Sequence, residues 1–334
     1  GIGLTQHRLT INLTPATLPK KGSGFDVAMV VAALQAEKKL KPSGDCVFLG
    51  EVGLDGSIRP IPGILPAVKA AADAGHSRVV VPAQNMHEAA LIPGIQVSGF
   101  RCLAEIFVAL GASAENLKYP PESVREQPTA EIPEHGIPSD MSDVAGQAQG
   151  RFALEIAAAG GHHLLFTGPP GSGKTMLAER LPGILPPLDD DAAMEVTAIR
   201  SLTAGGTPLR ELVRTPPFEA PHHSASAPAI LGGGSGIPRP GCVSKAHRGV
   251  LFLDEAPEFK RTVLDSLRQP LENGEIVLDR SAASATYPAR FQLILAANPC
   301  PCGMNVGTGT ECTCTPRERR GYFGKLSGPL LDRI

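Results

Sequence analysis

Three short apolar runs in the second half of the chain each end at a polar group. They cover residues 164–166, 249–253 and 291–297. An unbroken apolar run of this length is typical of a parallel strand that is buried on both faces. Open parallel sheets bind ligands at the carboxyl ends of their strands, so we expect a site where these runs end. The pattern predicts an α/β fold here, a parallel sheet with flanking helices.

The first 117 residues predict a smaller domain in which helices and strands are mixed (α+β). Residues 8–13 alternate between apolar and polar positions, as in a half-buried strand. Residues 25–40 predict a helix, because valines and a leucine recur on one helical face. Further strands are predicted at 47–50, 79–81 and 95–97, and further helices at 65–74 and 103–111.

A proline-rich segment separates the two patterns. Residues 118–138 contain five prolines among many polar residues, which favours an extended linker. A chain of 334 residues also suggests two domains, at about 150 residues each. The sequence therefore predicts one domain over 1–117, a linker over 118–138 and a second domain over 139–334.

The composition narrows the compartment and the partners. No apolar stretch approaches the ~20 residues of a membrane-spanning helix, and the first residues lack the pattern of a signal peptide. Seven cysteines with no secretory signal indicate a reducing, cytoplasmic location, without a membrane. The net charge of −2 argues against a globally basic nucleic-acid binder, but it is compatible with a ring whose pore is locally basic.

The first apolar run leads into a phosphate-binding motif, followed by helix-forming residues at 176–181. Its glycines let backbone N–H groups point at phosphate oxygens, and the helix N-terminus adds positive charge. A chance loop of Gly, Pro and Ser is the alternative, which the motifs at the other two runs make improbable. The motif, G-x-x-x-x-G-K-[ST], comprises Gly168, Pro169, Pro170, Gly171, Ser172, Gly173, Lys174 and Thr175.

The chemistry expected of these positions is that of an ATP site. Lys174 can reach the β- and γ-phosphates, and the Thr175 hydroxyl can ligate Mg²⁺. The second run ends in Asp254 and Glu255, which would support Mg²⁺ through water and activate the attacking water. Two solvated acids at a strand end are the alternative. The third run ends in Asn298, whose amide can bind the lytic water or the γ-phosphate. In this order the three runs resemble the core of an AAA+ ATPase.

The first domain resembles the proteolytic domain of Lon-type proteases over residues 19–29 and 50–63. That family cuts peptides with a Ser–Lys dyad, but the two positions fall on Gly24 and Leu65 here, and neither can act as nucleophile or base. Ser23 and Lys69 lie nearby, and a shift of one residue would rescue only one of them. A structural or partner-binding role is therefore expected instead of proteolysis.

Two insertions narrow the class of ATPase. Residues 218–241 are rich in Gly and Pro, which predicts a loop inserted into a helix, and 272–288 predict a hairpin before the third strand. Both features resemble the magnesium-chelatase/MCM branch of AAA+ proteins, where they project toward the pore of a ring. His222 and His223 lack an acidic or Cys partner at ligand spacing, so a surface or pore-facing pair is favoured over a metal site.

At the family level, the chain resembles the ComM/YifB magnesium chelatase-like ATPases. The resemblance implies a homohexameric ring that hydrolyses ATP with Mg²⁺ and moves DNA, with branch migration during natural transformation as the described role. The matching segments are 143–147, which packs near the adenine in relatives, 220–224, 238–241, 253–259 and 298–303. In such a ring Arg239, Lys245 and Arg280 are candidate contacts to DNA phosphates.

Four cysteines follow the third strand. Cys300, Cys302, Cys312 and Cys314 form two C-x-C pairs with nine residues between them. Four thiolates can hold Zn²⁺ in a tetrahedron, although C-x-x-C is the usual spacing. Four reduced thiols in a loop are the alternative.

The chain closes at Arg333, which in relatives is the arginine finger that reaches the neighbouring subunit's γ-phosphate. The resemblance also implies that the chain begins inside the Lon-like domain and stops before the helical lid with its second sensor arginine. Two other functions stay open: a motor for metal insertion by a chelatase, which the Lon-like domain disfavours, and a scaffold that does not hydrolyse ATP.

Overall fold

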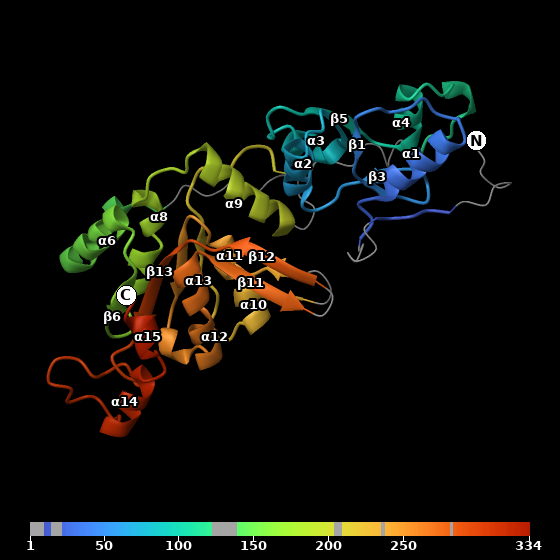
Figure 1. Cartoon of the computed structure of the whole chain (residues 1–334). Coiled ribbons are helices and arrows are strands. Elements are labelled where there is room, and N and C mark those ends of the chain that lie inside the picture. Colours follow the sequence, from blue (N-terminus) through green and yellow to red (C-terminus); the bar gives the residue numbers. More distant parts are fainter. Residues whose placement is uncertain (1–9, 15–21, 122–138, 204–208, 235–237, 281–282) are drawn as a thin grey trace. The chain divides into compact units, whose positions relative to one another are not determined.

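The computed structural model describes residues 10–14, 22–121, 139–203, 209–234, 238–280 and 283–334. The chain forms two compact units, one of residues 1–134 with 197–212 and the other of 135–196 with 213–334 (Figure 1). Residues 197–212, which the sequence gave no reason to separate from the second domain, thus belong with the first unit. Of the expected linker, only residues 118–121 are among those described.

The first unit is built on a parallel sheet in the order β1-β4-β5. Its core joins Val27, Val31 and Leu34 of the first helix to Phe48 and Val80 of the sheet. The elements are α1 (Asp26–Ala36), β1 (Val47–Phe48), β2 (Glu51–Val52), β3 (Ile58–Arg59), α2 (Ile64–Asp73), β4 (Arg78–Pro82), η1 (Ala83–Asn85), α3 (Met86–Ala89), β5 (Gln96–Phe100), α4 (Leu103–Ala109) and η2 (Ala114–Asn116).

Most elements predicted for this unit are present, with two corrections. The first helix ends at Ala36 and not at residue 40, and Lys38 just beyond it adopts a left-handed backbone with φ 56°. The strand predicted at 8–13 is wrong over its described part, since residues 10–13 form no strand. Ile11 and Leu13 stay exposed, so the alternating pattern has no buried face here. Residues 8 and 9 lie outside the described part.

The end of a long helix, α9 (Asp190–Thr203), contributes to the first unit. The Ser201 carbonyl accepts the N–H of Gly63 at 3.0 Å, and the Ser201 hydroxyl accepts the N–H of Leu65 at 3.4 Å. Both donors lie at the start of α2, where backbone N–H groups have no partner within the helix. Ser201 therefore caps α2, a contact between residues more than 130 positions apart.

The second unit contains a four-stranded parallel sheet in the order β6-β13-β10-β7. The two central strands are buried throughout. Leu251 and Leu293 face one hydrophobic core, and Phe252 and Ile294 face the other, as expected when successive side chains alternate. The strands are β6 (Leu164–Thr167), β7 (Phe218–Glu219), β10 (Val250–Leu253) and β13 (Gln292–Ala297).

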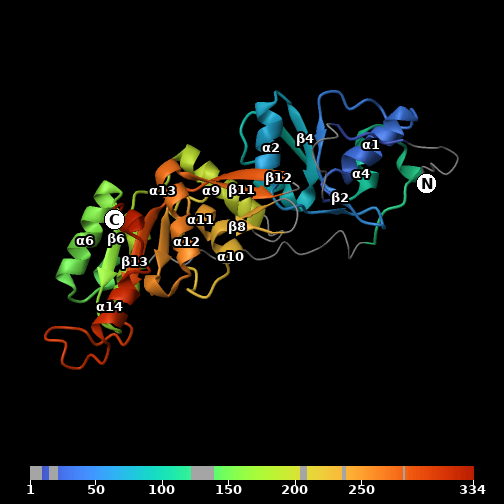
Figure 2. The same cartoon turned by 60° about the horizontal axis from the view of Figure 1, so that its bottom comes forward.

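Helices cover both faces of this sheet (Figure 2). One core includes residues of α6, α7 and α8, and the other includes residues of α10, α11 and α12. These and the remaining elements are η3 (Met141–Asp143), α6 (Ala148–Gly160), α7 (Lys174–Ala178), α8 (Leu181–Ile184), α10 (Ala227–Leu231), β8 (Gly232–Gly233), β9 (Arg239–Pro240), α11 (Cys242–Lys245), η4 (Ala256–Glu258), α12 (Arg261–Ser266), α13 (Arg268–Asn273), β11 (Glu275–Arg280), β12 (Ala283–Pro288), α14 (Pro316–Phe323) and α15 (Gly328–Leu331).

The predicted hairpin before the third strand is present as the antiparallel pair β11–β12. The prediction that 218–241 form a loop without a regular helix is wrong, because this segment contains β7, α10 and the pair β8–β9. The Ser226 hydroxyl accepts the N–H of Ala229 and caps α10, and Pro228 lies in the first turn, where no N–H is needed. Residues 235–237 lie outside the described part. Among the described residues, no helix has the length and apolar character needed to cross a bilayer.

Candidate nucleotide-binding site

The carboxyl ends of three parallel strands bring the expected site residues together. β6 leads into the phosphate-binding loop, β10 into Asp254 and Glu255, and β13 into Asn298. β13 lies between the other two, so all three ends meet at one edge of the sheet. The Gly168 N–H donates to the Ala297 carbonyl at 3.2 Å and extends the pairing into the loop.

The phosphate-binding loop depends on its glycines. Gly171 and Gly173 adopt φ of 75° and 82°, a left-handed backbone that favours glycine. Gly173 is also the N-cap of α7, so the loop opens directly into the helix. Gln147, from the segment expected near the adenine, donates through Nε2 to the Ser172 carbonyl at 2.9 Å.

Lys174 joins the loop to the third strand. Its ammonium donates to the carbonyls of Gly168 and Pro169 at 2.7 and 2.9 Å, and to the Asn298 amide oxygen at 3.2 Å. Burial lowers the pKa of Lys174, while the carboxylates of Asp254 and Glu255 oppose that shift. The ammonium thus lies where acceptors from the loop and from Asn298 converge.

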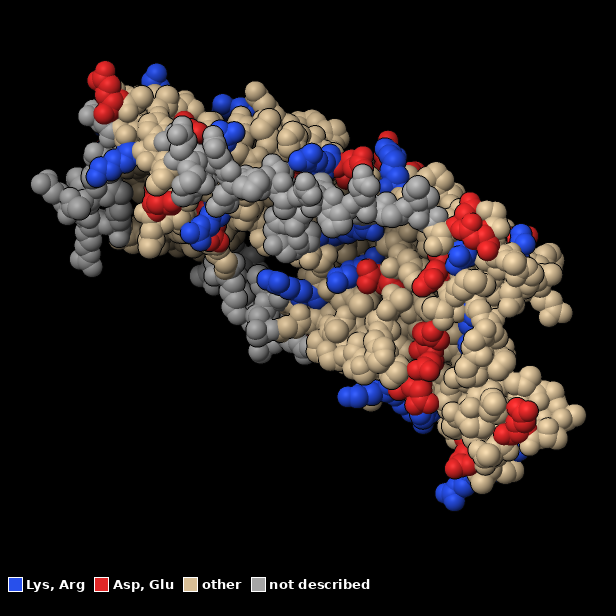
Figure 3. All heavy atoms as spheres, turned by 180° about the vertical axis from the view of Figure 1, so that it is seen from behind, with Lys and Arg blue, Asp and Glu red and all other residues tan. Residues whose placement is uncertain are grey.

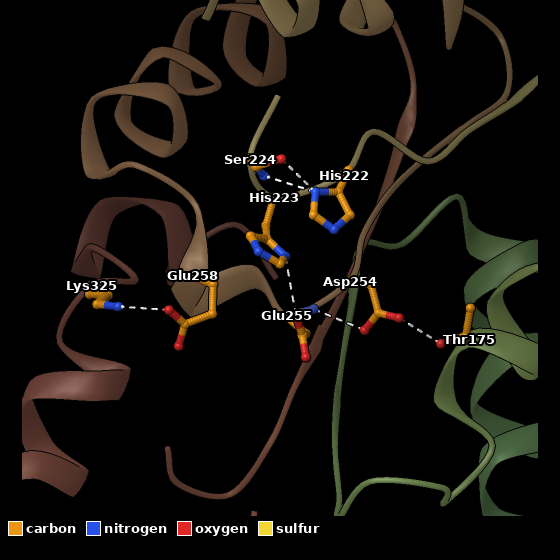
Figure 4. Close-up of polar contacts among 8 residues, drawn as sticks. All are labelled: Thr175, His222, His223, Ser224, Asp254, Glu255, Glu258 and Lys325. Carbon is orange, nitrogen blue, oxygen red and sulfur yellow. Dashed lines mark hydrogen bonds and ion pairs between the residues drawn. The ribbon is translucent and has the colours of Figure 1, made fainter. Parts of the chain in front are cut away.

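Thr175 and Asp254 form the second contact between separate motifs (Figure 4). The Thr175 hydroxyl donates to Asp254 Oδ2 at 2.7 Å, and the Glu255 N–H donates to Oδ1 of the same carboxylate at 2.9 Å. A hydroxyl and a carboxylate side by side are oxygen donors of the kind that Mg²⁺ prefers. The residues present therefore fit the magnesium ion that the sequence predicts.

Glu255 is held in an unusual conformation and has a partner that the sequence did not reveal. Its backbone adopts φ 51°, which is uncommon for a residue with a Cβ and recurs at functional sites. His223 Nδ1 lies 3.1 Å from Glu255 Oε2 (Figure 4). The ring of His223 also lies 4.1 Å from that of His222 and meets the edge of Phe259.

The sheet explains why these two residues meet. β7 and β10 are parallel, with Glu219 paired to Leu251. Continuing that register by four residues on each chain brings position 223 opposite position 255. The sequence favoured a surface or pore-facing pair for His222 and His223, and His223 instead contacts the expected catalytic acid. Among the described residues, neither histidine belongs to a cluster of three or more metal-ligating side chains.

Two further residues support the end of the third strand. The Tyr322 hydroxyl of α14 bonds the backbone of Asn298; burial raises the pKa of Tyr322, and that bond opposes the rise. Glu258, after the acid pair, forms an ion pair with Lys325 at 3.3 Å (Figure 4). Neither residue stood out in the sequence, because each acts through a contact with a distant segment.

Arg333 does not join this group of contacts within the chain. Its guanidinium forms an ion pair with Glu272 of α13 and donates to the Pro329 carbonyl. In the part of the chain that the structure describes, no contact links Arg333 to Lys174, Thr175 or Asp254. A role toward a neighbouring subunit stays a prediction.

The four cysteines expected as zinc ligands lie together. Their sulfur atoms are all within 4.8 Å of one another, and Cys300 is fully buried. Measured pairs are Cys300–Cys302 at 3.3 Å, Cys300–Cys312 at 3.6 Å and Cys302–Cys312 at 3.8 Å. The spacing of the two C-x-C pairs is therefore compatible with one compact site.

The candidate DNA contacts do not form one basic surface. Arg239 lies exposed in β9, Lys245 lies half-buried at the end of α11, and the side chain of Arg280 is outside the described part. On the face seen in Figure 3, Lys and Arg side chains are interspersed with Asp and Glu. This distribution agrees with the net charge of −2 and leaves DNA binding as a prediction.

Fold and site together define the class. A parallel sheet that joins a phosphate-binding loop, an acid pair and a polar residue at adjoining strand ends is the core of an AAA+ protein. The family model described as magnesium chelatase, subunit ChlI, matches residues 140–334, and the one described as subunit ChlI of Mg-chelatase matches residues 1–85. The chain belongs to the magnesium chelatase-like family that includes YifB and ComM.

Similar proteins come from several bacteria, and the chain aligns over 98% of its length with each of the three named here. An uncharacterized protein of Mycobacterium tuberculosis is 52% identical, and 63% of it is covered. YifB of Escherichia coli is 45% identical, with 62% covered. Competence protein ComM of Haemophilus influenzae is 43% identical, with 63% covered. The chain thus spans less than two thirds of these relatives.

Proposed function

We propose that the second unit binds ATP with Mg²⁺ and hydrolyses the bond to the γ-phosphate. The observation that carries the proposal is the 2.7 Å contact between Thr175 and Asp254, which joins the phosphate-binding loop to the acid pair. Two solvated acids at an ordinary strand end, the alternative left open by the sequence, have no reason to meet this particular hydroxyl.

Each residue then has a defined role in binding. The loop N–H groups and the start of α7 bind phosphate oxygens, and Lys174 exchanges its carbonyl acceptors for the β- and γ-phosphates. Thr175 and Asp254 hold the magnesium site, directly or through water. When bound, Mg²⁺ neutralises charge that develops on the phosphate oxygens.

Hydrolysis requires a water that is oriented and deprotonated. Glu255 is the general base in our proposal, because it follows Asp254 and its side chain points away from the Thr175 contact toward His223 (Figure 4). Asn298 lies beside Lys174 and orients the water or the γ-phosphate. Arg333 supplies the finger in trans, which presupposes a homo-oligomeric ring, a hexamer in the family we assign.

The work done by hydrolysis is assigned from the family. ComM is named a competence protein, and we propose that this chain likewise acts on DNA in the cytoplasm, as a helicase or translocase during natural transformation. The hairpin β11–β12 and the segment around β8 and β9 are the expected DNA-contacting elements. A motor for metal insertion is the second candidate, favoured by the description of the matching family models.

One assay separates the candidates. ATP turnover by the full-length protein is measured alone, with single-stranded DNA and with branched DNA. A DNA motor gives turnover that DNA stimulates and that Lys174→Ala abolishes. A chelatase motor gives turnover that DNA leaves unchanged, and a scaffold gives none even when it binds nucleotide. Steep loss of DNA stimulation with added salt would further support contacts to DNA phosphates.

A further inference from the structure

The loop of residues 299–315, here called the cysteine loop, joins β13 to α14 and contains four of the seven cysteines. Tetrahedral zinc–thiolate sites have Zn–S bonds of about 2.3 Å, which places neighbouring sulfur atoms about 3.8 Å apart. The three measured separations of 3.3, 3.6 and 3.8 Å lie close to that edge length. The largest separation in the set, within 4.8 Å, requires only a small adjustment.

The alternatives fit the geometry less well. A disulfide needs sulfur atoms about 2.05 Å apart, and all four cysteines are free. Iron–sulfur clusters contain several irons and need their thiolates spread around a larger core. Hydrogen bonds between thiols are weak and cannot by themselves account for four converging side chains. A single ion at the centre of the four sulfurs accounts for all of these contacts.

We propose that Cys300, Cys302, Cys312 and Cys314 bind one Zn²⁺, and that this ion holds the cysteine loop against the phosphate-binding loop. The contact between the two loops is at Gly303, which follows the first cysteine pair. Gly303 has φ 79°, and a Cβ at this position would lie 2.7 Å from Pro170 Cδ. The cysteine loop thus forms one wall of the phosphate-binding loop.

Both ends of the cysteine loop are fixed to functional elements. Cys300 lies two residues after Asn298, so an ion at Cys300 restrains the residue expected to orient water. Arg319 of α14 donates to Asn305 Oδ1 at 2.9 Å, and Thr315 and Glu318 form a capping box at the start of α14. α14 in turn carries Tyr322, whose hydroxyl bonds the Asn298 backbone. Zinc would therefore stabilise a closed circuit around Asn298.

The first experiment reads the metal alone. Full-length protein, purified without an immobilised-metal column, is analysed for zinc and iron by mass spectrometry. We expect one zinc per chain, loss of that zinc in Cys312→Ser/Cys314→Ser, and retention in the control Cys46→Ser, whose cysteine lies in the first unit. Zinc near zero in the wild type, or iron in its place, overturns the proposal.

A second measurement guards against a variant that fails to fold. Zinc released from the wild type is followed with a colorimetric chelator, and Co²⁺ is then added to the apoprotein. Tetrahedral thiolate coordination gives intense absorption in the visible and near-ultraviolet, while octahedral oxygen coordination gives almost none. A spectrum without thiolate bands overturns the four-cysteine site, whatever the variants do.

The effect on the nucleotide rests on the proposed ATP site and is tested separately. We expect apoprotein to bind a non-hydrolysable ATP analogue more weakly than zinc-loaded protein, with readdition of Zn²⁺ restoring affinity. Lys174→Ala should lose nucleotide binding yet keep its zinc. Zinc present with unchanged nucleotide affinity would refute the link between the loops, and zinc present without any nucleotide binding would refute the ATP site alone.

Discussion

His223 lies 3.1 Å from the carboxylate of Glu255, and the pair connects β7 with β10 at the edge of the proposed ATP site. A general base that is paired with another side chain is less available to water. His223 thus acts as a positioning residue for Glu255, on a segment expected to contact DNA.

Replacing His223 tests this relationship. We expect His223→Ala to raise ATP turnover without DNA by up to about 5-fold, the equivalent of the 1 kcal/mol limit for an exposed ion pair, and to reduce the further stimulation by DNA. His222→Ala is the matched control, since His222 bonds Ser224 and not Glu255. Equal effects of both variants, or lower basal turnover in His223→Ala alone, would contradict the assigned role.

Glu255 itself should be needed for hydrolysis and not for binding. Glu255→Gln keeps the shape of the side chain but removes the base, so turnover should fall by about 10²–10⁴-fold while the affinity for ATP is retained. Nucleotide affinity by calorimetry and phosphate release together provide the measurement. Glu258→Gln is the control, because that carboxylate pairs with Lys325 and should leave turnover within a few-fold. A Glu255→Gln protein that turns over normally would assign the base elsewhere.

Arg333 should act on a neighbour's nucleotide. Arg333→Ala should lower turnover by about 10³–10⁵-fold with nucleotide binding unchanged, whereas Arg317→Ala, at an exposed position, should not. Mixing Arg333→Ala with Glu255→Gln should recover part of the activity, because some interfaces then combine an intact base with an intact arginine. No recovery in mixed, exchanging subunits would indicate that Arg333 has only the contact to Glu272 seen within the chain.

Gly303 should matter for the fit between the cysteine loop and Pro170. Gly303→Ala places a Cβ 2.7 Å from Pro170, so nucleotide affinity should fall while the zinc content stays at that of the wild type. Gly307→Ala is a matched control: its φ of 57° is also left-handed, but nothing lies within 4 Å of the added Cβ. If both substitutions weaken nucleotide binding equally, backbone strain and not the contact is responsible.

Two buried histidines should make the second unit sensitive to acid. His247 accepts the Arg290 N–H and His163 accepts the Leu293 N–H, each through Nδ1 at 3.0 Å. Burial lowers the pKa of both below 6.5, and Glu195 beside His247 opposes the shift. The unfolded chain therefore binds protons first, so this stabilisation is complete above pH 6.5 and is lost as pH falls below it.

The expected slope is up to about 1.4 kcal/mol per pH unit for each histidine, between 6.5 and its pKa in the folded protein. Urea denaturation at about pH 7.5, 6.5 and 5.5 measures it. His247→Gln should flatten the slope, and replacement of the exposed His87 should not. An unchanged slope in His247→Gln would show that other groups cause the acid sensitivity.

The sequence predicted the central elements of the second unit because they carry their own signals. β6, β10 and β13 are uninterrupted apolar runs, and the phosphate-binding loop is specified by glycines and one lysine. The residues expected to bind ATP and Mg²⁺ meet as predicted, since the end of a parallel strand fixes where the next residue lies.

Features that depend on tertiary pairing were not predictable. β7 has only two residues and forms by pairing with β10, so neither the strand nor the contact between His223 and Glu255 could be inferred from periodicity. α10 is a single short helix in a segment rich in Gly and Pro, where propensity argues for a loop. The alternation in residues 10–13 failed for the opposite reason: a local pattern was present, but those side chains stay exposed.

β13 lies between the strands that carry the phosphate-binding loop and the acid pair, and all six of its residues are buried. Its last residue accepts a backbone hydrogen bond from Gly168, and Asn298 and Cys300 follow within three positions. A small displacement of this one strand end would thus be transmitted at once to lysine, amide and thiol groups. Substitutions that alter packing beneath β13, far from any phosphate, should therefore change nucleotide handling and metal retention together.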